Sequence, residues 1–267
     1  MKLKIIKSSK SFKYNKELSI LEDQNNLLIQ ATELLHNWKN DDGDKFFVLG
    51  EIIGIRNSDL KLSNDIDWSI IEKQENTKII EGRYIVIKKS KKDKISIWTD
   101  FFGRVDIYWT SDTSSIEITS GISLFSKSIN KGGIDQIALS QALTIYGSRP
   151  LKKHTLYSEI SRLGVQEKLN INNDIVSITR LQFEPKNVFQ KDDKSKLDLY
   201  SDIFIEAVRS RASEKQNIVF LSSGWDSTSI LATLVQLFGS SKIDCVIGRM
   251  RYSNRSGIIN QFELDRA

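Results

Sequence analysis

Apolar and polar residues alternate in short runs over roughly the first 190 residues of the chain, a pattern typical of β-strands. Glycines and charged residues separate these runs, which predicts turns between the strands. The predicted strands are Phe46–Ile55, Arg83–Lys89, Lys94–Thr99, Val105–Thr110 and Ser115–Ser120, with further strand pairs in Leu156–Asn172 and Asp174–Pro185. A domain built largely of strands is therefore expected over residues 1–190.

Apolar residues at helical spacing interrupt this region twice, in Gln24–Trp38 and in Ile134–Tyr146. The apolar positions are Leu27, Leu28, Ala31, Leu34 and Leu35 in the first stretch and Ile137, Ala138, Ala142 and Ile145 in the second. Each stretch predicts a helix. With the strands, the two helices predict a layered α+β domain.

The character of the sequence changes near Lys191, where the charged stretch Gln190–Lys196 predicts a linker. The elements predicted after it are a helix over Lys196–Ala212, a strand over Ile218–Leu221, a helix that ends at Gly239 and a strand over Ile243–Ile247. Helix, strand, helix, strand predicts a parallel α/β sheet in residues 191–267, and the unbroken apolar run of its first strand predicts that both faces are covered. Because a doubly wound sheet has about five strands, we expect this domain to be truncated.

Composition sets limits on the class of protein. Hydrophobic residues make up 39% of the chain and charged residues 27%, as in an ordinary soluble globular protein. No stretch approaches the roughly 20 apolar residues of a membrane helix, so no membrane partner is expected. The single cysteine, Cys245, excludes an internal disulfide and fits a reducing cytoplasm, and we expect its thiol to be packed inside its strand.

Charge and histidine content exclude two further classes of site. The net charge is +5, but many lysines fall on predicted turns such as Lys88–Lys94, which favours a solvated hairpin loop over a nucleic-acid surface. The two histidines, His36 and His154, lie far apart in the sequence, so no metal site can be read from them. Neither nucleic acid nor zinc is an expected partner.

The stretch Ser222–Ser227 lies where the strand Ile218–Leu221 gives way to a helix. Unpaired N–H groups and the helix dipole attract anions at such a position, and Gly224 lets a ligand approach the backbone. Additional donor hydroxyls belong to Ser222, Ser223, Ser227 and Thr228. The carboxylate of Asp226 suits a Mg²⁺ ion that accompanies a phosphate. The pattern indicates a nucleotide or pyrophosphate site, with the alternative that serine and aspartate only cap the helix.

The same stretch resembles the Ser-Gly-Gly-x-Asp-Ser pyrophosphate loop of N-type ATP pyrophosphatases, with Ser223 in place of the first glycine. Its flanks resemble those of glutamine-hydrolysing asparagine synthetases: a helix precedes the strand, and the next strand ends in Val246-Ile247-Gly248. Glu263 or, in another register, Gln261 resembles the start of the family's following helix. The resemblance implies that ATP and Mg²⁺ bind here. The residues implied are Leu221 and Ile247 near adenine, Ser222, Ser223, Gly224 and Ser227 at the phosphates, and Asp226 at the metal.

Upstream segments resemble the class II glutamine amidotransferase domain of that family. Thr99–Trp109 is similar to its Arg-Asp-x-x-Gly-x-x-Pro-Leu-Tyr-Tyr segment, Glu81–Ile87 to the strand before it, and Gly133–Leu163 to the helix and hairpin that join the two domains. The resemblance covers most of residues 46–267 and leaves residues 1–45 unassigned. It implies a reduced glutaminase-like domain over residues 1–190 and the start of an ATP pyrophosphatase domain over residues 191–267.

Parts of the glutaminase pattern are missing. The family's nucleophile is a cysteine at the N-terminus, whereas this sequence starts Met1-Lys2-Leu3. Leu49-Gly50-Glu51 is similar to the Asn-Gly-Glu turn that binds glutamine, but Leu49 lacks the amide of asparagine. We therefore expect that glutaminase activity is lost and assign no catalytic residue; a wrongly chosen start is the alternative.

The family resemblance implies ATP-dependent amide-bond formation, in which a substrate carboxylate forms an acyl-adenylate with release of pyrophosphate and an amine then displaces AMP. One alternative is a related biosynthetic ligase that acts on a sugar acid or a peptide. Another is a non-catalytic truncated subunit, favoured by the truncation and by Ser223. A partner chain that supplies the rest of the synthetase domain is a further expectation. The upstream resemblance argues against a tRNA-thiolation enzyme.

Overall fold

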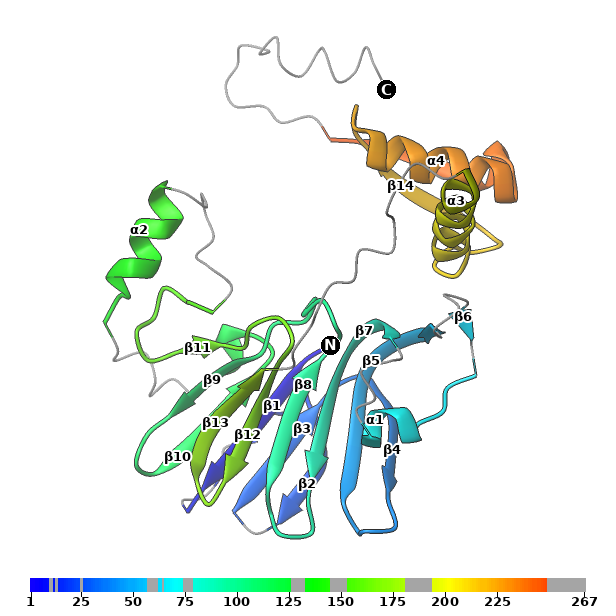
Figure 1. Ribbon diagram of the computed structural model, residues 1–267. Coiled ribbons are helices and arrows are strands. Elements are labelled where there is room, and N and C mark those ends of the chain that lie inside the picture. The colour runs from blue at the N-terminus through cyan, green and yellow to red at the C-terminus, as the bar shows by residue number, and fades with distance from the viewer. Residues whose placement is uncertain are drawn as a thin grey trace. The chain divides into compact units, whose positions relative to one another are not determined.

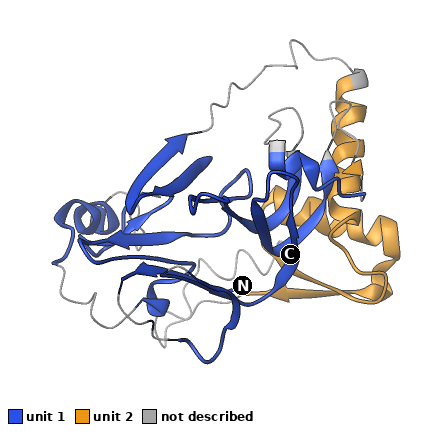
Figure 2. Ribbon diagram, turned by 90° about the horizontal axis from the view of Figure 1, so that it is seen from below, with its two compact units in different colours: residues 1–56, 64–185 blue, residues 57–63, 186–267 orange. Residues whose placement is uncertain are grey.

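The computed structural model divides the chain into two compact units (Figure 2). Residues 1–56 and 64–185 form the first unit, and residues 57–63 and 186–267 form the second. The residues that the structure describes are 1–9, 12, 14–24, 26–56, 62–63, 65–73, 79–125, 133–144, 153–180 and 194–248. Most of the predicted linker Gln190–Lys196, and the positions Gln261 and Glu263, lie outside these ranges.

The first unit consists mainly of two antiparallel sheets (Figure 1). Sheet A has the strand order β11-β9-β10-β1-β3-β2, and sheet B runs β13-β12-β8-β7-β5-β4. The strands are β1 (Leu3–Ser8), β2 (Ser19–Gln24), β3 (Leu27–Ala31), β4 (Leu34–Lys39), β5 (Lys45–Arg56), β7 (Ile79–Lys89), β8 (Ile95–Thr99), β9 (Tyr108–Ser111), β10 (Ser115–Thr119), β11 (Ser161–Arg162), β12 (Glu167–Asn172) and β13 (Ile175–Arg180). The described helices are α1 (Ser69–Lys73), the 3-10 turn η1 (Ile122–Leu124) and α2 (Gln136–Thr144).

The main core of the first unit lies between the two sheets. Alternate residues of each strand point inward, as the period of a β-strand requires. Fully buried members are Leu3, Ile5 and Ile29 of sheet A and Leu49, Ile85, Ile87, Ile97 and Leu169 of sheet B. Each sheet thus covers the apolar face of the other, and the unit closes its core from within the chain.

A second apolar cluster lies on the outer face of sheet B, where α1 covers part of it. Ile71 of α1 packs with Phe46, Val48, Tyr84, Val86 and Trp98. Aromatic rings extend the cluster: the imidazole of His36 stacks on Trp68, with ring centroids 4.3 Å apart, and Trp38 stacks on Phe46 at 4.8 Å. The indole N–H of Trp38 donates to the Glu72 carboxylate of α1. These contacts bind α1 to the sheet.

The helix predicted over Gln24–Trp38 is wrong. This stretch contains the end of β2, all of β3 and most of β4. Asn26 and Glu33 adopt positive φ angles of 60° and 57°, and each of them marks a turn that breaks a helix. All five residues of β3 are buried, so its leucines fill both faces of a strand rather than one face of a helix.

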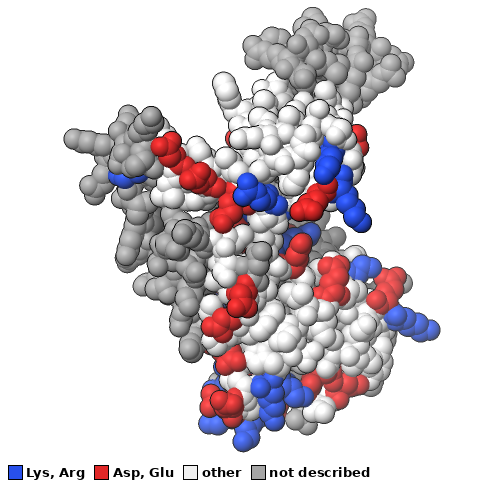
Figure 3. All heavy atoms as spheres, turned by 90° about the vertical axis from the view of Figure 1, so that its right-hand side faces the viewer, with Lys and Arg blue, Asp and Glu red and all other residues white. Residues whose placement is uncertain are grey.

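The helix predicted over Ile134–Tyr146 is confirmed as α2 in its described residues, and the predicted strands from Phe46 onward are confirmed by β5, β7, β8, β10, β12 and β13. The strand predicted over Val105–Thr110 begins only at Tyr108, and residues 145–146 and 181–185 lie outside the described ranges. The expected layers are present as two packed sheets, but the described part of the first unit is mostly antiparallel sheet, with fewer and shorter helices than an α+β domain predicts. The lysine-rich stretch Lys88–Lys94 includes the turn between β7 and β8, with Lys91 and Lys92 exposed. On the face shown in Figure 3 the basic side chains lie among acidic ones.

A buried ion network joins the two sheets at one end of the sandwich. The Glu22 carboxylate of β2 accepts hydrogen bonds from Lys89 at 2.8 Å and from Lys45 at 2.9 Å. Burial by itself raises the pKa of Glu22, but the bonds from Lys89 and Lys45 outweigh it, so the pKa lies below its usual value. Because Glu22 belongs to sheet A and both lysines to sheet B, the network fixes one sheet against the other.

The second unit contains the four elements expected after the linker, which are α3 (Lys194–Arg209), β14 (Asn217–Leu221), α4 (Trp225–Phe238) and β15 (Ile243–Ile247). The 3-10 turn η3 (Ser240–Lys242) and the short strand β6 (Leu62–Ser63), which comes from an earlier part of the chain, were not predicted. β14 and β15 pair in parallel, with Leu221 opposite Ile247. Gly239 ends α4 with a φ of 83°, a conformation that favours glycine.

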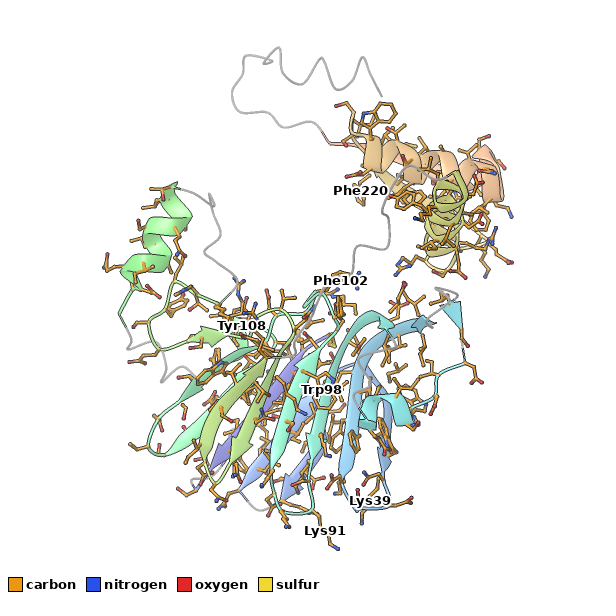
Figure 4. The ribbon with its side chains drawn as sticks, viewed as in Figure 1. Lys39, Lys91, Trp98, Phe102, Tyr108 and Phe220 are labelled. Carbon is orange, nitrogen blue, oxygen red and sulfur yellow. The ribbon has the colours of Figure 1, made fainter. Side chains whose placement is uncertain are left out.

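The expectation that both faces of β14 are covered is wrong for the described residues. Val219 is buried beside α4, whereas Ile218 and Phe220 on the opposite face are 64% and 77% exposed (Figure 4). Cys245 of β15 is also exposed rather than packed. No helix in the described part of the chain is long and apolar enough to cross a membrane.

Candidate functional site

The loop between β14 and α4 places the predicted phosphate-binding residues at the start of a 14-residue helix. Gly224 is the N-cap residue, with φ −83° and ψ 150°, and no side chain caps the helix. The alternative in which serine or aspartate only caps α4 therefore does not describe this loop. Glycine at the cap keeps the space above the first turn open, since it has no side chain.

The hydroxyls of Ser222, Ser227 and Thr228 bond to the loop itself. Ser227 Oγ accepts from the N–H of Ser222 at 3.0 Å and lies 3.1 Å and 3.2 Å from the carbonyl oxygens of Ser222 and Gly224, one of which takes its proton. Thr228 Oγ1 donates to the Gly224 carbonyl at 3.0 Å. Ser222 Oγ lies 3.0 Å from Ser227 Oγ. These bonds define the shape of the turn rather than leaving the hydroxyls available.

The backbone N–H groups of the loop behave differently. Within the described residues, no hydrogen bond engages the N–H of Ser223, Trp225, Asp226 or Ser227, while that of Gly224 donates to Ser222 Oγ at 3.3 Å. Trp225, Asp226 and Ser227 belong to the first turn of α4, where no preceding helical carbonyl is in place to accept from their N–H groups. The arrangement can accept an anion at the positive end of the helix dipole.

Asp226 and the two apolar residues complete the predicted set. The Asp226 side chain is exposed on the first turn of α4. Leu221 and Ile247 are half-buried and lie opposite each other in the register of the parallel strands, next to the loop. The structure thus brings all seven predicted residues to the carboxyl ends of β14 and β15, the edge where open α/β sheets bind ligands.

The residues present fit a magnesium ion only as a companion of a phosphate ligand. The described part of the chain contains no group of three or more histidine, cysteine, aspartate or glutamate side chains that could hold a metal. Asp226 is the one carboxylate in the loop, so the remaining oxygen ligands would come from the phosphates and water, as Mg²⁺ commonly arranges.

The sequence reasoning left Trp225 out of the site. This residue occupies the first position of α4 and is 88% exposed. The sequence itself indicated that Trp225 is unusual, because it is the one large aromatic residue in a turn of small and polar residues. Its exposure beside the unpaired N–H groups makes it a natural optical probe of the loop.

In the first unit, the segment that resembles the family's glutamine-binding turn is part of a strand. Leu49, Gly50 and Glu51 lie inside β5, and Gly50 pairs with Tyr84 of β7. Gly50 has φ 96°, and a Cβ there would collide with the Arg83 carbonyl oxygen. The glycine therefore serves a close approach of two strands. The Met1 side chain packs beside it, and the Met1 amine lies 2.6 Å from the Glu33 carboxylate.

The segment Thr99–Trp109 contains a turn built on a buried aspartate. Asp100 accepts from the N–H groups of Phe102 at 3.1 Å and Arg104 at 2.9 Å, and its side chain is almost fully buried. Burial raises the pKa of Asp100, and these backbone bonds oppose the shift. Gly103 adopts φ 59° in the same turn, and Phe102 is exposed on it (Figure 4). Asp100 is a structural acceptor in this arrangement.

Comparison with known proteins identifies no family. No family model and no curated protein matches the sequence. Among solved structures, the glutamine phosphoribosylpyrophosphate (PRPP) amidotransferase from B. subtilis complexed with ADP and GMP is similar with a TM-score of 0.33 and 9% identity, over 96% of this chain and 62% of that one. A structure titled as the allosteric regulatory enzyme of purine biosynthesis has a TM-score of 0.34 and 9% identity, over 98% and 63%.

This chain therefore spans less than two thirds of the length of either similar structure. TM-scores of 0.33 and 0.34 establish neither a common fold nor a common activity. What the second unit does has to be inferred from its loop.

Proposed function

We propose that this chain takes part in ATP-dependent amide-bond formation and that the Ser222–Ser227 loop binds the phosphates of ATP. The observation that carries the proposal is the set of loop N–H groups, at the start of α4, that have no partner among the described residues. Such groups favour an anion through hydrogen bonds and the helix dipole. The resemblance of the loop to those of N-type ATP pyrophosphatases supports the pyrophosphate part of ATP as that anion.

The chain's own residues divide the work within this proposal. Ser222 and Ser227 hold the turn in shape through their mutual bonds, and the backbone N–H groups bind the β- and γ-phosphates. Asp226 would help to hold Mg²⁺, which would offset phosphate charge, and Leu221 and Ile247 would offer apolar contact to adenine. Bound ATP supplies an α-phosphate for attack by a substrate carboxylate. The loop N–H groups stabilise the charge that develops on the departing pyrophosphate.

The first unit enters the proposal as a glutaminase-like domain without glutaminase activity. The one cysteine of the sequence, Cys245, belongs to the second unit, and Leu49-Gly50-Glu51, the segment similar to the family's glutamine-binding turn, lies inside β5. Without glutaminase activity, the amine that displaces AMP from the acyl-adenylate is free ammonia or another amine. Release of glutamate from glutamine by this chain contradicts this part of the proposal.

Calorimetric titration of the full chain with MgATP and with pyrophosphate tests the phosphate site. Asp226→Asn is expected to weaken MgATP binding at least ~10-fold, since the variant loses the only loop carboxylate. Metal-free pyrophosphate binding is expected to be unchanged or tighter. Asp202→Asn, which changes an exposed residue of α3, is the matched control and should bind as the wild type does. A wild-type chain that binds neither ligand, both alone and with a partner chain that completes the domain, contradicts the proposal.

Exchange of labelled pyrophosphate into ATP tests the ligase reaction itself. Aspartate is the first carboxylate to try, followed by sugar acids and peptides, because the related biosynthetic ligases use them. Exchange that depends on one of these carboxylates identifies the acceptor class, and Asp226→Asn should abolish it.

A non-catalytic subunit is the second candidate, and a different observation favours it. Ile218, Phe220 and Val246 leave one face of the parallel pair exposed within the described residues, and Ser223 replaces a family glycine. A partner chain supplying further strands and helices of the domain would cover such a face. MgATP binding that appears only with that partner supports a split enzyme, and no binding in either state supports the non-catalytic subunit.

A further inference from the structure

The described strands that form the edges of sheets A and B are β11, β2, β13 and β4, and β13 differs from the other three. β11 has only two residues, and the register of β2 and of β4 is interrupted, between Ile20 and Glu22 and between Leu34 and His36. β13 pairs with β12 over all six of its residues without a shift (Figure 1). Because short strands and bulges keep an edge from pairing with another chain, β13 is the described edge best suited to such pairing.

The composition of β13 does not protect its edge either. Its sequence, Ile-Val-Ser-Ile-Thr-Arg, contains no proline, lysine or acidic residue, the residue types that commonly discourage pairing at an edge. Ile175 and Ile178 are 69% and 39% exposed, although Val176 packs partly against the core. The strand thus presents β-branched apolar side chains at an open edge.

The turn before β13 determines which backbone groups face that edge. Asn173 and Asp174 have φ angles of 47° and 61°, as a two-residue type I′ turn requires, so Asn172 and Ile175 close the hairpin as a hydrogen-bonded pair. Such pairs alternate along an antiparallel ladder, so every second residue from Ile175 onward bonds to β12. The residues between them direct their N–H and C=O groups to the open edge. These residues are Val176, Ile178 and Arg180.

β13 is self-complementary about Ser177. If two copies of the strand pair antiparallel with Ser177 opposite Ser177, Val176 of each copy lies opposite Ile178 of the other, and their open-edge groups bond to each other. Val176 and Ile178 share the face of Ile171 and Leu169, their buried partners in β12. The pairing therefore continues the apolar inner face of sheet B from one copy into the next.

Charges at the two ends of β13 fit the same register. Arg180 is exposed and forms no ion pair among the described residues, since Glu167, opposite it in β12, is paired with Lys153. Across the axis, Arg180 lies opposite Asp174 of the other copy. The Asp174 side chain is 75% exposed, and Lys7 lies 2.8 Å from its Oδ1. A slip by two residues loses the pairing of Arg180 with Asp174, so the charges select this register.

We propose that two copies of this chain associate through β13, which joins their B sheets into one antiparallel sheet about a two-fold axis at Ser177. The same residues then meet from both sides, as a two-fold interface requires. One six-residue edge buries less area than a standard interface, so the dimer is weak and forms in the micromolar range or above. The phosphate loop of the second unit has no part in this association.

A pair of cysteine variants tests the register. Ser177→Cys and Thr179→Cys are each made in the full chain with Cys245→Ser, because Cys245 is exposed. Across the axis the Cα atoms of residue 177 lie about 4.5 Å apart, within reach of a disulfide, whereas those of residue 179 lie roughly 14 Å apart. Mild oxidation should therefore yield a covalent dimer of Ser177→Cys and not of Thr179→Cys, as seen on a non-reducing gel. Both positions are exposed on the same face of β13.

Sedimentation velocity from nanomolar to millimolar concentration measures the association itself. Ile178→Lys should raise the dissociation constant at least ~10-fold, since it places a charge between the paired strands. Ile20→Lys, which changes an exposed isoleucine of the β2 edge, is the matched control and should dimerise as the wild type does. If Ile178→Lys fails to fold, the cysteine pair still decides. A wild-type chain that stays monomeric, a dimer that a folded Ile178→Lys leaves intact, or equal cross-linking of the two cysteine variants overturns the proposal.

Discussion

The two units of this chain contain similar apolar strands and bury them to different extents. In the first unit, Ile85 and Ile97 are fully buried, because the strands of sheet A cover the inner face of sheet B. In the second unit, Ile218 and Phe220 remain exposed, because α4 lies against only one side of β14 among the described residues. An apolar strand therefore indicates a core only where a second layer is present to cover it.

The largest expected effect comes from truncating one isoleucine of the closed core. Ile97→Ala should lower the free energy of unfolding of the first unit by about 3 kcal/mol, since it removes buried methyl groups and leaves a cavity. Phe220→Ala removes a larger side chain from the exposed face of β14 and should change stability by less than ~0.5 kcal/mol. Urea unfolding followed by circular dichroism measures both. Equal losses for the two variants would show that the face of β14 is covered.

The second prediction concerns the charges that fix sheet A to sheet B. Glu22→Gln leaves two lysines without their buried counter-charge and should lower the free energy of unfolding by about 3 kcal/mol at neutral pH. The pKa of Glu22 is lowered in the folded state, so its contribution is complete above the unfolded-state value of about 4.5 and is lost as the pH falls through the folded-state pKa.

Acid unfolding distinguishes the loss of the Glu22 charge in Glu22→Gln from a loss of stability that does not depend on pH. The wild type should lose its advantage over Glu22→Gln as the pH falls below about 4.5, so the two stability curves converge in acid. Glu17→Gln, which removes an exposed partner of Lys2, serves as the control and should leave the curve close to that of the wild type. Parallel curves for Glu22→Gln and the wild type throughout the acid range would contradict the assignment.

The third prediction concerns the close approach of β5 and β7. Gly82 has φ 155°, and a Cβ there would collide with the carbonyl oxygen of Glu51. Gly82→Ala should therefore cost the first unit about 2 kcal/mol. Gly121→Ala is the matched control, since Gly121 has an extended φ of −161° and no atom lies within 4 Å of its added Cβ. Thermal unfolding of the two variants measures the difference.

The sequence predicted β5, β7 and β8 of sheet B well, because charged residues mark a turn such as Lys88–Lys94, whereas β4 of the same sheet fell inside a wrongly predicted helix. It failed at Leu27–Ala31, where an apolar run suits a helix face and a doubly buried strand equally. The position of the phosphate loop followed from the change of pattern after Leu221. The sequence could not predict that the Ser222 and Ser227 hydroxyls bond within the loop, because the bonds between these two residues form only in the folded turn.

The smallest expected effect concerns Cys245, and it tests the open state of the second unit directly. Cys245 belongs to β15 and is exposed among the described residues, although Val219, its partner in the parallel pair, is buried. Cys245→Ser should therefore change the free energy of unfolding by less than ~0.5 kcal/mol. An aromatic disulfide reagent should modify the thiol of the native chain about as fast as that of the chain in urea, because both thiols meet the same solvent. Much slower reaction of the native thiol would mean that β15 is covered in solution, and the contrast between a closed and an open unit would fail at that strand.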